Sequence, residues 1–312
     1  MHVLVLGAGG IGGYFGGRLV EAGADVTFLV REERAKRLRA EGLGVESPLG
    51  DIRTKVRTAT SANSIAPVDV VLLSCKAYDL TAALDAIAPA IGNGTAILPL
   101  LNGVAHLDTI AMRLPSAALW GGAAHISVTL NPNGGVQHFG ELNGIGFGLR
   151  HGGEDRRAEE LRSLFARTPV KARARSEIVQ DMWDKFVFIA TLAGMTCLMR
   201  ASVGTILAVP SGKRLLELML EECERVAKAE GFEVEAQRFD PYRRNLMQPG
   251  SPLTASMLRD MERGGPTEAE HIIGDMAARA SRHGIATPLA EIALTHMRTY
   301  EKRRTERNAA AS

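Results

Sequence analysis

The hydrophobic and polar positions follow two different patterns along the chain. Up to about residue 174, short apolar runs alternate with stretches of helical periodicity. That alternation is typical of a parallel sheet whose strands are joined by crossover helices. From Ser176 onward, apolar residues recur at helical spacing over long segments. We therefore predict an α/β domain over residues 1–174 and an all-helical domain over residues 175–312.

Strands are expected in the first domain where apolar runs are bounded by turn residues, at 2–6, 25–30, 68–74 and 95–100. Two further segments are typical of hairpins. Residues 44–56 turn at Pro48-Leu49-Gly50, and residues 125–139 turn at Asn133-Gly134, a dipeptide that favours tight hairpin turns. The second hairpin predicts an antiparallel extension of a Rossmann-type doubly wound sheet.

Four helices are predicted in the second domain. Ser176 is a candidate N-cap for a helix that runs to about Ala201, and residues 213–231 form an amphipathic stretch that ends in glycine. Thr267 and Glu270 have capping-box spacing and would open a third helix. Thr287-Pro288 would open the fourth. Apolar faces on such helices would allow a homodimer.

Composition narrows the classes of function. The 312 residues leave room for about two domains, and 37 basic side chains nearly balance 35 acidic ones. This balance indicates neither a nucleic-acid partner nor a membrane partner. The three cysteines are far apart, with no CxxC pair and no histidine at ligand spacing, so we expect neither disulfides nor a metal site.

The chain shows no sign of export or membrane insertion. Its first residues lack the basic segment of a signal peptide, and reduced cysteines fit a cytoplasmic protein. The uncharged run 186–199 is too short to cross a hydrocarbon core of about 30 Å. We expect it to be a buried helix.

A glycine-rich motif directly follows the first predicted strand and opens the first predicted helix. It consists of Gly7, Ala8, Gly9, Gly10, Ile11 and Gly12. In a dinucleotide-binding fingerprint, the first glycine makes the tight turn, the second lets the backbone approach a pyrophosphate, and the third lets the helix pack on the strand. The helix N-terminus then faces the anion. A glycine-rich turn that binds nothing is the alternative, which the strand-motif-helix order disfavours.

Arg31 indicates which dinucleotide binds. It ends the second predicted strand, where an NAD enzyme has a carboxylate for the ribose hydroxyls. A guanidinium can hold a 2′-phosphate with charge-assisted hydrogen bonds, whereas a carboxylate would repel it. We therefore predict NADP(H). The alternative is that Arg31 opens a solvated charged helix, and the neighbouring Glu32 and Glu33 leave it open.

Three polar side chains are candidates for the chemistry. Lys76 and Asn102 each follow a predicted buried strand, and ligands collect at the carboxyl ends of parallel strands. Lys185 enters the most apolar helix of the chain. A buried ammonium is costly unless it is compensated, and partial burial lowers its pKa toward the range of a general acid. A surface lysine at position 76 and an ordinary turn at 102–103 are the alternatives.

Taken together, these motifs resemble the ketopantoate reductases (2-dehydropantoate 2-reductases) of pantothenate biosynthesis over the whole chain. The motifs are the glycine fingerprint with Arg31, Ser74-Cys75-Lys76-Ala77, Leu101-Asn102-Gly103, Trp183-Asp184-Lys185, Ser256-Met257-Leu258-Arg259-Asp260 and Thr267-Glu268. The resemblance implies that Lys185 is the proton donor, that Glu268 is its partner, and that Ser256 binds the substrate.

The resemblance also assigns residues to the cofactor. It implies that Lys76 and Asn102 lie where cofactor meets substrate, that Asn102 binds both of them, and that Lys185 also binds the substrate. Ser127 falls where the family backbone touches the nicotinamide, and Glu268 lies near the same group.

One departure concerns the substrate. The family has asparagines one and two turns after the lysine and another near the helix exit, where this chain has Ile189, Ala193 and Val203. Positions 185, 189 and 193 share a helix face, so the wall beside Lys185 has become apolar. The 4-hydroxyl of ketopantoate would lose its partners, at about 1–3 kcal/mol for an unpaired hydroxyl.

The sequence thus predicts an NADPH-dependent reductase of a small 2-oxo acid, with ketopantoate to pantoate as the leading reaction. A family paralogue that reduces a more apolar 2-oxo acid is one alternative. A non-catalytic NADP(H)-binding sensor is another, although a sensor would need neither Lys185 nor Glu268.

Overall fold

The structure, a computed structural model, describes residues 1–311. Contacts divide the chain into two compact units. Unit 1 contains residues 1–101 and 106–181, and unit 2 contains residues 102–105 and the chain from Met182 onward. Helix α6 (Ile178–Met199) begins in unit 1 and continues into unit 2.

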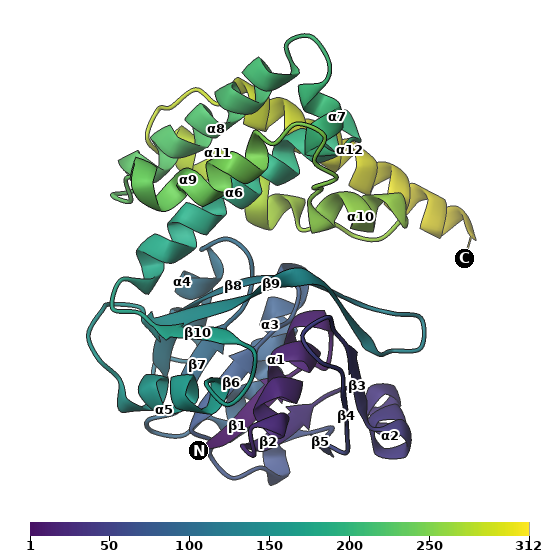
Figure 1. The fold of residues 1–312 in the computed structure, drawn as a ribbon, viewed down its shortest axis with the longest axis vertical. Helices are drawn as coiled ribbons and strands as arrows, with labels where there is room; N and C mark the ends of the chain where they lie inside the picture. Colours follow the sequence, from purple (N-terminus) through teal and green to yellow (C-terminus); the bar gives the residue numbers. More distant parts are fainter. Residues whose placement is uncertain (312) are drawn as a thin grey trace. The chain divides into compact units, whose positions relative to one another are not determined.

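In the described part of unit 1, ten strands form one mixed sheet (Figure 1). Their order is β4-β3-β9-β8-β7-β6-β1-β2-β5, and β10 also pairs with β9. Strands β7, β6, β1, β2 and β5 run parallel, while β8 and β9 are antiparallel. The bounds are β1 (His2–Leu6), β2 (Asp25–Leu29), β3 (Leu43–Glu46), β4 (Ile52–Thr54), β5 (Arg57–Ala59), β6 (Val70–Leu73), β7 (Ala96–Pro99), β8 (Ala118–Leu130), β9 (Val136–Leu149) and β10 (Lys171–Ala174).

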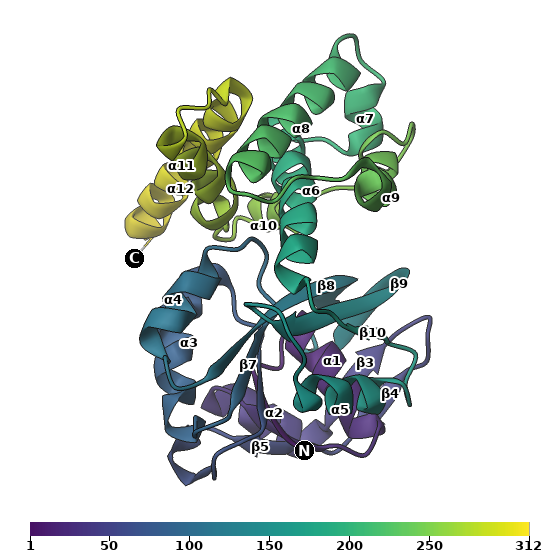
Figure 2. The same cartoon turned by 90° about the vertical axis from the view of Figure 1, so that its left-hand side faces the viewer.

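Helices cover both faces of this sheet (Figure 2). Within β1, Val3 and Val5 belong to one hydrophobic core with Phe15, whereas Leu4 belongs to a second core with Leu84. Successive residues of a strand point to opposite faces, so both faces are buried, as in a doubly wound sheet. The helices are α1 (Gly10–Glu21), α2 (Glu32–Glu41), α3 (Leu80–Ile87), α4 (His106–Arg113) and α5 (Arg156–Phe165), with short 3₁₀ turns η1 (Ala62–Ser64), η2 (Ala77–Asp79) and η3 (Ala88–Ala90).

The β8–β9 hairpin is the predicted antiparallel extension, and it is longer than the sequence indicated. Pairing runs from Leu130 opposite Val136 to Trp120 opposite Leu149. The predicted strand at 125–130 continues backward because Trp120 and its neighbours are buried in the core. The prediction of a Rossmann-type sheet with this extension is confirmed.

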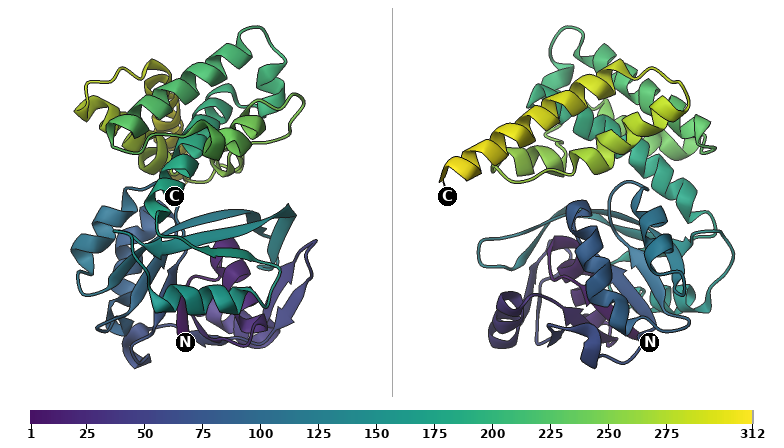
Figure 3. Two further views of the ribbon diagram at one scale, coloured as in Figure 1. Left: turned by 60° about the vertical axis from the view of Figure 1, so that its left-hand side comes forward. Right: turned by 180° about the vertical axis from the view of Figure 1, so that it is seen from behind.

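Helices are the only regular secondary structure in the described residues of unit 2 (Figure 3). Helix α12 is the longest of them and packs against α8, α11 and a π-helical turn, η4. The four predicted helices are present, whereas α7, α9 and α10 were not predicted. The bounds are α7 (Val203–Leu207), α8 (Gly212–Ala229), α9 (Ala236–Leu246), α10 (Ser256–Glu262), η4 (Glu270–Gly274), α11 (Asp275–Arg282) and α12 (Pro288–Ala311).

Helix α6 supplies much of the core of unit 2. Val187, Ala190 and Met195 are fully buried, and Gly194 lets α6 approach α8, because a Cβ there would lie 2.9 Å from Met219 Cε. By length and composition α6 could cross a membrane, but 72% of its most apolar window is buried inside the protein. A buried apolar helix is expected in the core of a helical domain.

Candidate active site

The glycine loop of unit 1 has the geometry of a dinucleotide cradle. Gly7 has a φ of +87°, a left-handed conformation that favours glycine. A Cβ on Gly12 would lie 2.3 Å from the Gly7 carbonyl oxygen and 2.3 Å from Ser74 Oγ, so only glycine fits there. A Cβ on Gly9 would meet nothing within 4 Å. The loop is therefore closed toward the strand and open at Gly9.

The start of α1 fits a pyrophosphate. Gly9 is its N-cap, no side-chain cap forms there among the described residues, and the first turn contains no acidic residue. The first N–H groups of a helix lack intrahelical partners and bind anions well. Ser74 Oγ donates to the Leu6 carbonyl at 2.9 Å, which ties β6 to the end of β1 beneath the loop. The donor set thus suits the two phosphates of a dinucleotide.

The carboxyl ends of the parallel strands present the predicted residues in a defined order. The neighbouring strands β7, β6, β1 and β2 are followed in the chain by Asn102, Lys76, Gly7 and Arg31, respectively. Arg31 is exposed and is the N-cap of α2, and Lys76 is half-buried and precedes η2. Lys76 and Arg31 therefore flank the glycine loop, while Asn102 belongs to unit 2.

Arg34 is a further cationic residue at this loop, and the sequence analysis missed it. Its Nη2 donates to the Ala8 carbonyl at 2.9 Å, and its Nε is buried without a hydrogen-bond partner among the described atoms. Burial, together with the neighbouring Arg37, lowers the pKa of Arg34. Arg37 in turn donates to the Asn133 carbonyl at the hairpin tip. Residues 31, 34 and 37 recur every three residues, a helical spacing that could have revealed this row.

Ser127 lies at an irregularity of the β8–β9 hairpin. Ile126 pairs with Asn143 and Val128 pairs with His138, so Ser127 opposes a stretch of β9 that leaves the ladder. A bulge frees backbone groups from strand pairing and commonly occurs beside active sites. Ser127 is half-buried, and its predicted contact with a nicotinamide stays a prediction.

Lys185 lies on α6 directly after two residues that are held by contacts of their own. Trp183 stacks on Phe232 with ring centroids 5.2 Å apart, and buried Asp184 pairs with Arg238 at 3.0 Å. The Lys185 side chain is half-buried. Removal from water lowers the pKa of Lys185 to about 8, and the charge of Glu268 partly opposes that shift. The chain at Lys185 is thus anchored by its neighbours, and the Lys185 ammonium has a pKa well below that of an ordinary lysine.

Glu268 and His271 lie next to each other at the start of the π-turn. Glu268 is 8% exposed, and its charge raises the pKa of both Lys185 and His271. Burial nevertheless lowers the pKa of His271 overall, and the imidazole hydrogen-bonds the backbone of Asn102. π-Turns inside helices are frequent at functional sites. His271 was missed, because the sequence showed a regular helix there.

Asn102 and Gly103 lie against this π-turn rather than in an ordinary surface turn. Gly103 is buried with a φ of +79°, and a Cβ on it would lie 3.3 Å from the His271 carbonyl oxygen. The conformation therefore favours glycine, and the space beside it is tight. Unit 2 thus brings together Asn102, Lys185, Glu268 and His271.

The remaining predicted residues differ in exposure. Ser256 is exposed in the first turn of α10. Ile189 is half-buried, and both Ala193 and Val203 are buried. The α6 face that continues from Lys185 is therefore apolar, as the sequence indicated.

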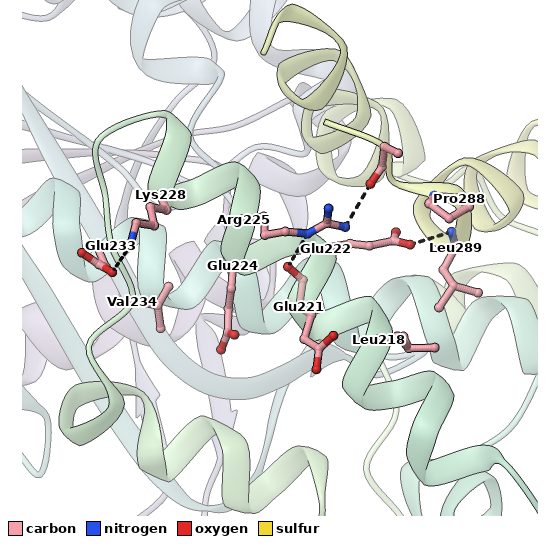
Figure 4. Close-up of a pocket in the computed structure, with 11 residues that line it drawn as sticks. Leu218, Glu221, Glu222, Glu224, Arg225, Lys228, Glu233, Val234, Pro288 and Leu289 are labelled. Carbon is pink, nitrogen blue, oxygen red and sulfur yellow. Dashed lines mark hydrogen bonds and ion pairs between the residues drawn. The ribbon is translucent and has the colours of Figure 1, made fainter. Parts of the chain in front are cut away.

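A separate groove of about 770 Å³ lies on unit 2, between α8 and the start of α12 (Figure 4). In it, buried Glu222 accepts from the backbone N–H groups of Leu289 and Ala290 at 3.0 and 2.9 Å and so caps α12. Arg225 Nη2 donates to the Ala286 carbonyl at 3.0 Å. Lys185 and Glu268 do not line this groove, and the contacts of Glu222 and Arg225 hold α8 to the start of α12.

The described residues contain no cluster of metal ligands, and two of the three thiols are shielded. Across residues 1–311 no group of three or more histidine, cysteine or acidic side chains could hold a metal ion. Burial raises the pKa of Cys197 and of Cys223 to about 12. Both thiols are therefore protonated and shielded, whereas Cys75 next to Lys76 is only half-buried.

Comparisons with known proteins find relatives over nearly the whole chain. The family profile "Ketopantoate reductase PanE/ApbA" matches residues 3–151, and "Ketopantoate reductase PanE/ApbA C terminal" matches residues 177–301. The "Uncharacterized oxidoreductase YkpB" of Bacillus subtilis is 33% identical over 96% of this chain and 99% of its own. The 2-dehydropantoate 2-reductase of Halobacterium salinarum is 30% identical over 93% of this chain and 95% of its own. A solved ternary structure of D-mandelate dehydrogenase with NADH and anilino(oxo)acetate has a TM-score of 0.87 at 21% identity, covering 98% of this chain and 100% of that one, and shares the fold.

Proposed function

Because this chain belongs to the ketopantoate reductase PanE/ApbA family and is an oxidoreductase, we propose that it reduces a small 2-oxo acid to the 2-hydroxy acid with NADPH. Ketopantoate is the leading substrate, which would place the reaction in pantothenate biosynthesis. The observation that carries the proposal is the half-buried Lys185, whose pKa is about 8 and whose charge faces Glu268.

When bound, NADPH supplies the hydride that reduces the 2-oxo carbon. Negative charge then develops on the carbonyl oxygen, and the Lys185 ammonium stabilises this charge and donates the proton. A pKa near 8 suits this role, because the group is largely protonated at neutral pH yet gives up its proton more readily than an ordinary lysine. Glu268 keeps the ammonium charged and oriented. Asn102, with its backbone held by His271, would hold the reacting groups in place.

The preference for NADPH over NADH rests on the arginines of unit 1. Arg31 is exposed at the end of β2, and Arg34 lies on the next turn with its guanidinium at the glycine loop. Two guanidinium groups at this end of the cradle favour a 2′-phosphate over two ribose hydroxyls. Arg31 is the N-cap of α2 and Arg34 lies in its first turn, so the start of one helix would present both side chains.

Two classes of 2-oxo acid are candidates for the substrate. The buried Ala193 and Val203 and the half-buried Ile189 provide no partner for the 4-hydroxyl of ketopantoate. A paralogue that reduces a more apolar 2-oxo acid is therefore the second candidate. The shared fold with a D-mandelate dehydrogenase supports this candidate only in showing that the architecture accommodates another 2-oxo or 2-hydroxy acid.

A panel of 2-oxo acids tests the proposal. Ketopantoate, 2-oxoisovalerate and an aromatic 2-oxo acid are each incubated with the protein and NADPH or NADH, and the loss of absorbance of the reduced nicotinamide is followed. We expect turnover with NADPH and a kcat/KM for ketopantoate at least comparable with that for 2-oxoisovalerate. A strong preference for an apolar acid would select the paralogue. Binding of NADPH without turnover of any acid would leave the non-catalytic sensor.

A further inference from the structure

The segment that carries Glu268 is held in place by side chains of α12. The backbone N–H of Thr267 donates to Glu301 Oε1 at 2.6 Å, and the Tyr300 hydroxyl donates to the Gly265 carbonyl at 2.7 Å. On the other side of Glu268, the Glu270 carboxylate accepts two hydrogen bonds from Arg298, at 2.6 and 2.8 Å. Residues on both sides of Glu268 are thus bonded to α12, which lies 28 to 35 positions away in sequence.

These contacts replace the predicted capping box. In such a box, the Glu270 carboxylate would accept from the Thr267 N–H, and Thr267 Oγ1 would accept from a backbone N–H of the first turn. Instead Glu270 pairs with Arg298, and Thr267 Oγ1 is buried without a hydrogen-bond partner among the described atoms. Glu301, on another helix, therefore accepts the hydrogen bond from the Thr267 N–H that the capping box predicts for Glu270.

Glu301 is suited to hold a backbone amide. Burial would raise the pKa of Glu301, but hydrogen bonds from Thr267 and Arg304 outweigh it, so the pKa of Glu301 lies below its ordinary value. Arg304 Nε donates to Glu301 Oε2 at 2.8 Å and orients the carboxylate. Glu301 is thus charged at neutral pH, and a charged acceptor forms the stronger hydrogen bond to an N–H donor.

We propose that Glu301 is a positioning residue for the reaction, which fixes the backbone immediately before Glu268 so that the Glu268 carboxylate stays beside Lys185. This inference rests on the proposed function. A carboxylate displaced by even a small distance interacts less with the ammonium, because the interaction weakens with separation and with access of water. Loss of the Glu301 contact should therefore impair proton donation and leave the glycine loop of unit 1 unaffected.

The main experiment compares Glu301→Ala with Glu301→Gln and Glu306→Ala. Gln keeps an oxygen acceptor for the Thr267 N–H, whereas Glu306 is an exposed carboxylate on the same helix that pairs with Lys302 at 3.6 Å. We expect Glu301→Ala to lower kcat about tenfold while the Kd for NADPH changes by less than about threefold. Glu301→Gln should recover most of the rate, and Glu306→Ala should match the unmodified protein.

The pH profile provides a readout that a purely structural role would not change. Glu268 raises the pKa of Lys185, so a displaced Glu268 should move the alkaline limb of kcat to lower pH in Glu301→Ala and not in Glu306→Ala. His271, which also faces Glu268, and Asp275 beyond it are unchanged in both variants. A Glu301→Ala protein with unaltered kcat and an unaltered alkaline limb would overturn the proposal, whatever its melting temperature.

Two measurements keep the test decisive. If Glu301→Ala does not fold, Tyr300→Phe removes the neighbouring bond to Gly265 and should shift kcat and the alkaline limb in the same direction by a smaller amount; no shift would overturn the proposal. If the unmodified protein turns over no 2-oxo acid, the proposed function fails separately. Amide hydrogen exchange of residues 265–270 then decides positioning: faster exchange in Glu301→Ala than in Glu306→Ala supports it, and equal exchange refutes it.

Discussion

The glycine loop of unit 1 and the segment around Glu268 in unit 2 each lead into a helix, but they are built differently. The glycine loop is shaped by its own residues, since Gly7 and Gly12 meet the conformational and spatial demands within six positions of each other. The Glu268 segment owes its placement to Glu301, Tyr300 and Arg298 on α12. A site made of backbone can be local, whereas a site made of ionisable side chains needs support from distant elements.

The largest expected effect separates chemistry from cofactor binding. Lys185→Ala removes the proposed proton donor and should lower kcat by about 10²–10⁴-fold. The Kd for NADPH, measured by fluorescence titration, should stay nearly constant, because the glycine loop is intact. Lys213→Ala, at an exposed lysine of α8, is the control and should leave both values unchanged. Unchanged turnover in Lys185→Ala would show that Lys185 is not the proton donor.

The next prediction tests the two sides of the glycine loop. Gly12→Ala places a Cβ 2.3 Å from backbone and from Ser74, so it should lower the melting temperature and weaken NADPH binding by about 100-fold. Gly9→Ala meets nothing within 4 Å and should fold normally, yet it should weaken binding because its methyl group occupies the face where a pyrophosphate would lie.

Gly44→Ala, where a Cβ also meets nothing within 4 Å, serves as the control for both glycine variants. It should change neither the melting temperature nor the Kd for NADPH. Equal NADPH affinities in Gly9→Ala and Gly44→Ala would contradict the assignment of the open face to the cofactor.

Arg34→Gln tests the residue that the sequence analysis missed. The amide can still donate to the Ala8 carbonyl but carries no charge for a 2′-phosphate. We expect kcat/KM for NADPH to fall about tenfold and the value for NADH to change little. Arg39→Gln, on the other side of the same helix and exposed, is the matched control. An equal loss of kcat/KM with NADPH and NADH would show that Arg34 supports the glycine loop and does not bind the 2′-phosphate.

The pH dependence of turnover follows from the same comparison. Lys185 must be protonated to donate, and its pKa is about 8. The rate should therefore be constant below that value and fall as pH rises through it, to about a tenth at one unit above. Stopped-flow measurement of hydride transfer across this range checks the prediction. A rate that stays constant to a pH near the ordinary lysine pKa of about 10.4 would contradict it.

The smallest expected effect concerns the substrate. Val203→Asn restores one amide near the exit of α6, and it should raise the ratio of kcat/KM for ketopantoate to that for 2-oxoisovalerate by a few-fold at most, since one hydrogen bond contributes about 0.5–1.5 kcal/mol. Val203→Ala is the control for the loss of volume. A ratio that falls in Val203→Asn would indicate that the pocket prefers apolar acids.

The sequence predicted the parts of this molecule that depend on local patterns. Residues 2–6 and 68–74 were recognised as strands because a strand buried on both faces is apolar throughout, and α1 was recognised from the glycine motif before it. The candidate residues Lys76, Asn102 and Lys185 were noticed because each is polar beside an apolar run. All three roles in the reaction remain predictions.

What the sequence could not show depends on contacts between distant positions. Arg34 looked like one of many charges on a solvated helix, and only its bond to Ala8 distinguishes it. His271 lies in a π-turn, which has no sequence signature distinct from an α-helix. The Thr267–Glu270 spacing predicted a capping box, but Arg298 and Glu301 compete for both halves of it, and neither is adjacent in the chain.

The cysteines provide an experimental route into this site. Because Cys197 and Cys223 are buried and their pKa values are about 12, a maleimide added to the folded protein should modify Cys75 alone. Cys75 precedes Lys76 just after β6, so a fluorophore attached there would lie next to one of the candidate site residues. The fluorescence of a label on Cys75 could therefore report the binding of NADPH, with no cysteine removed or introduced.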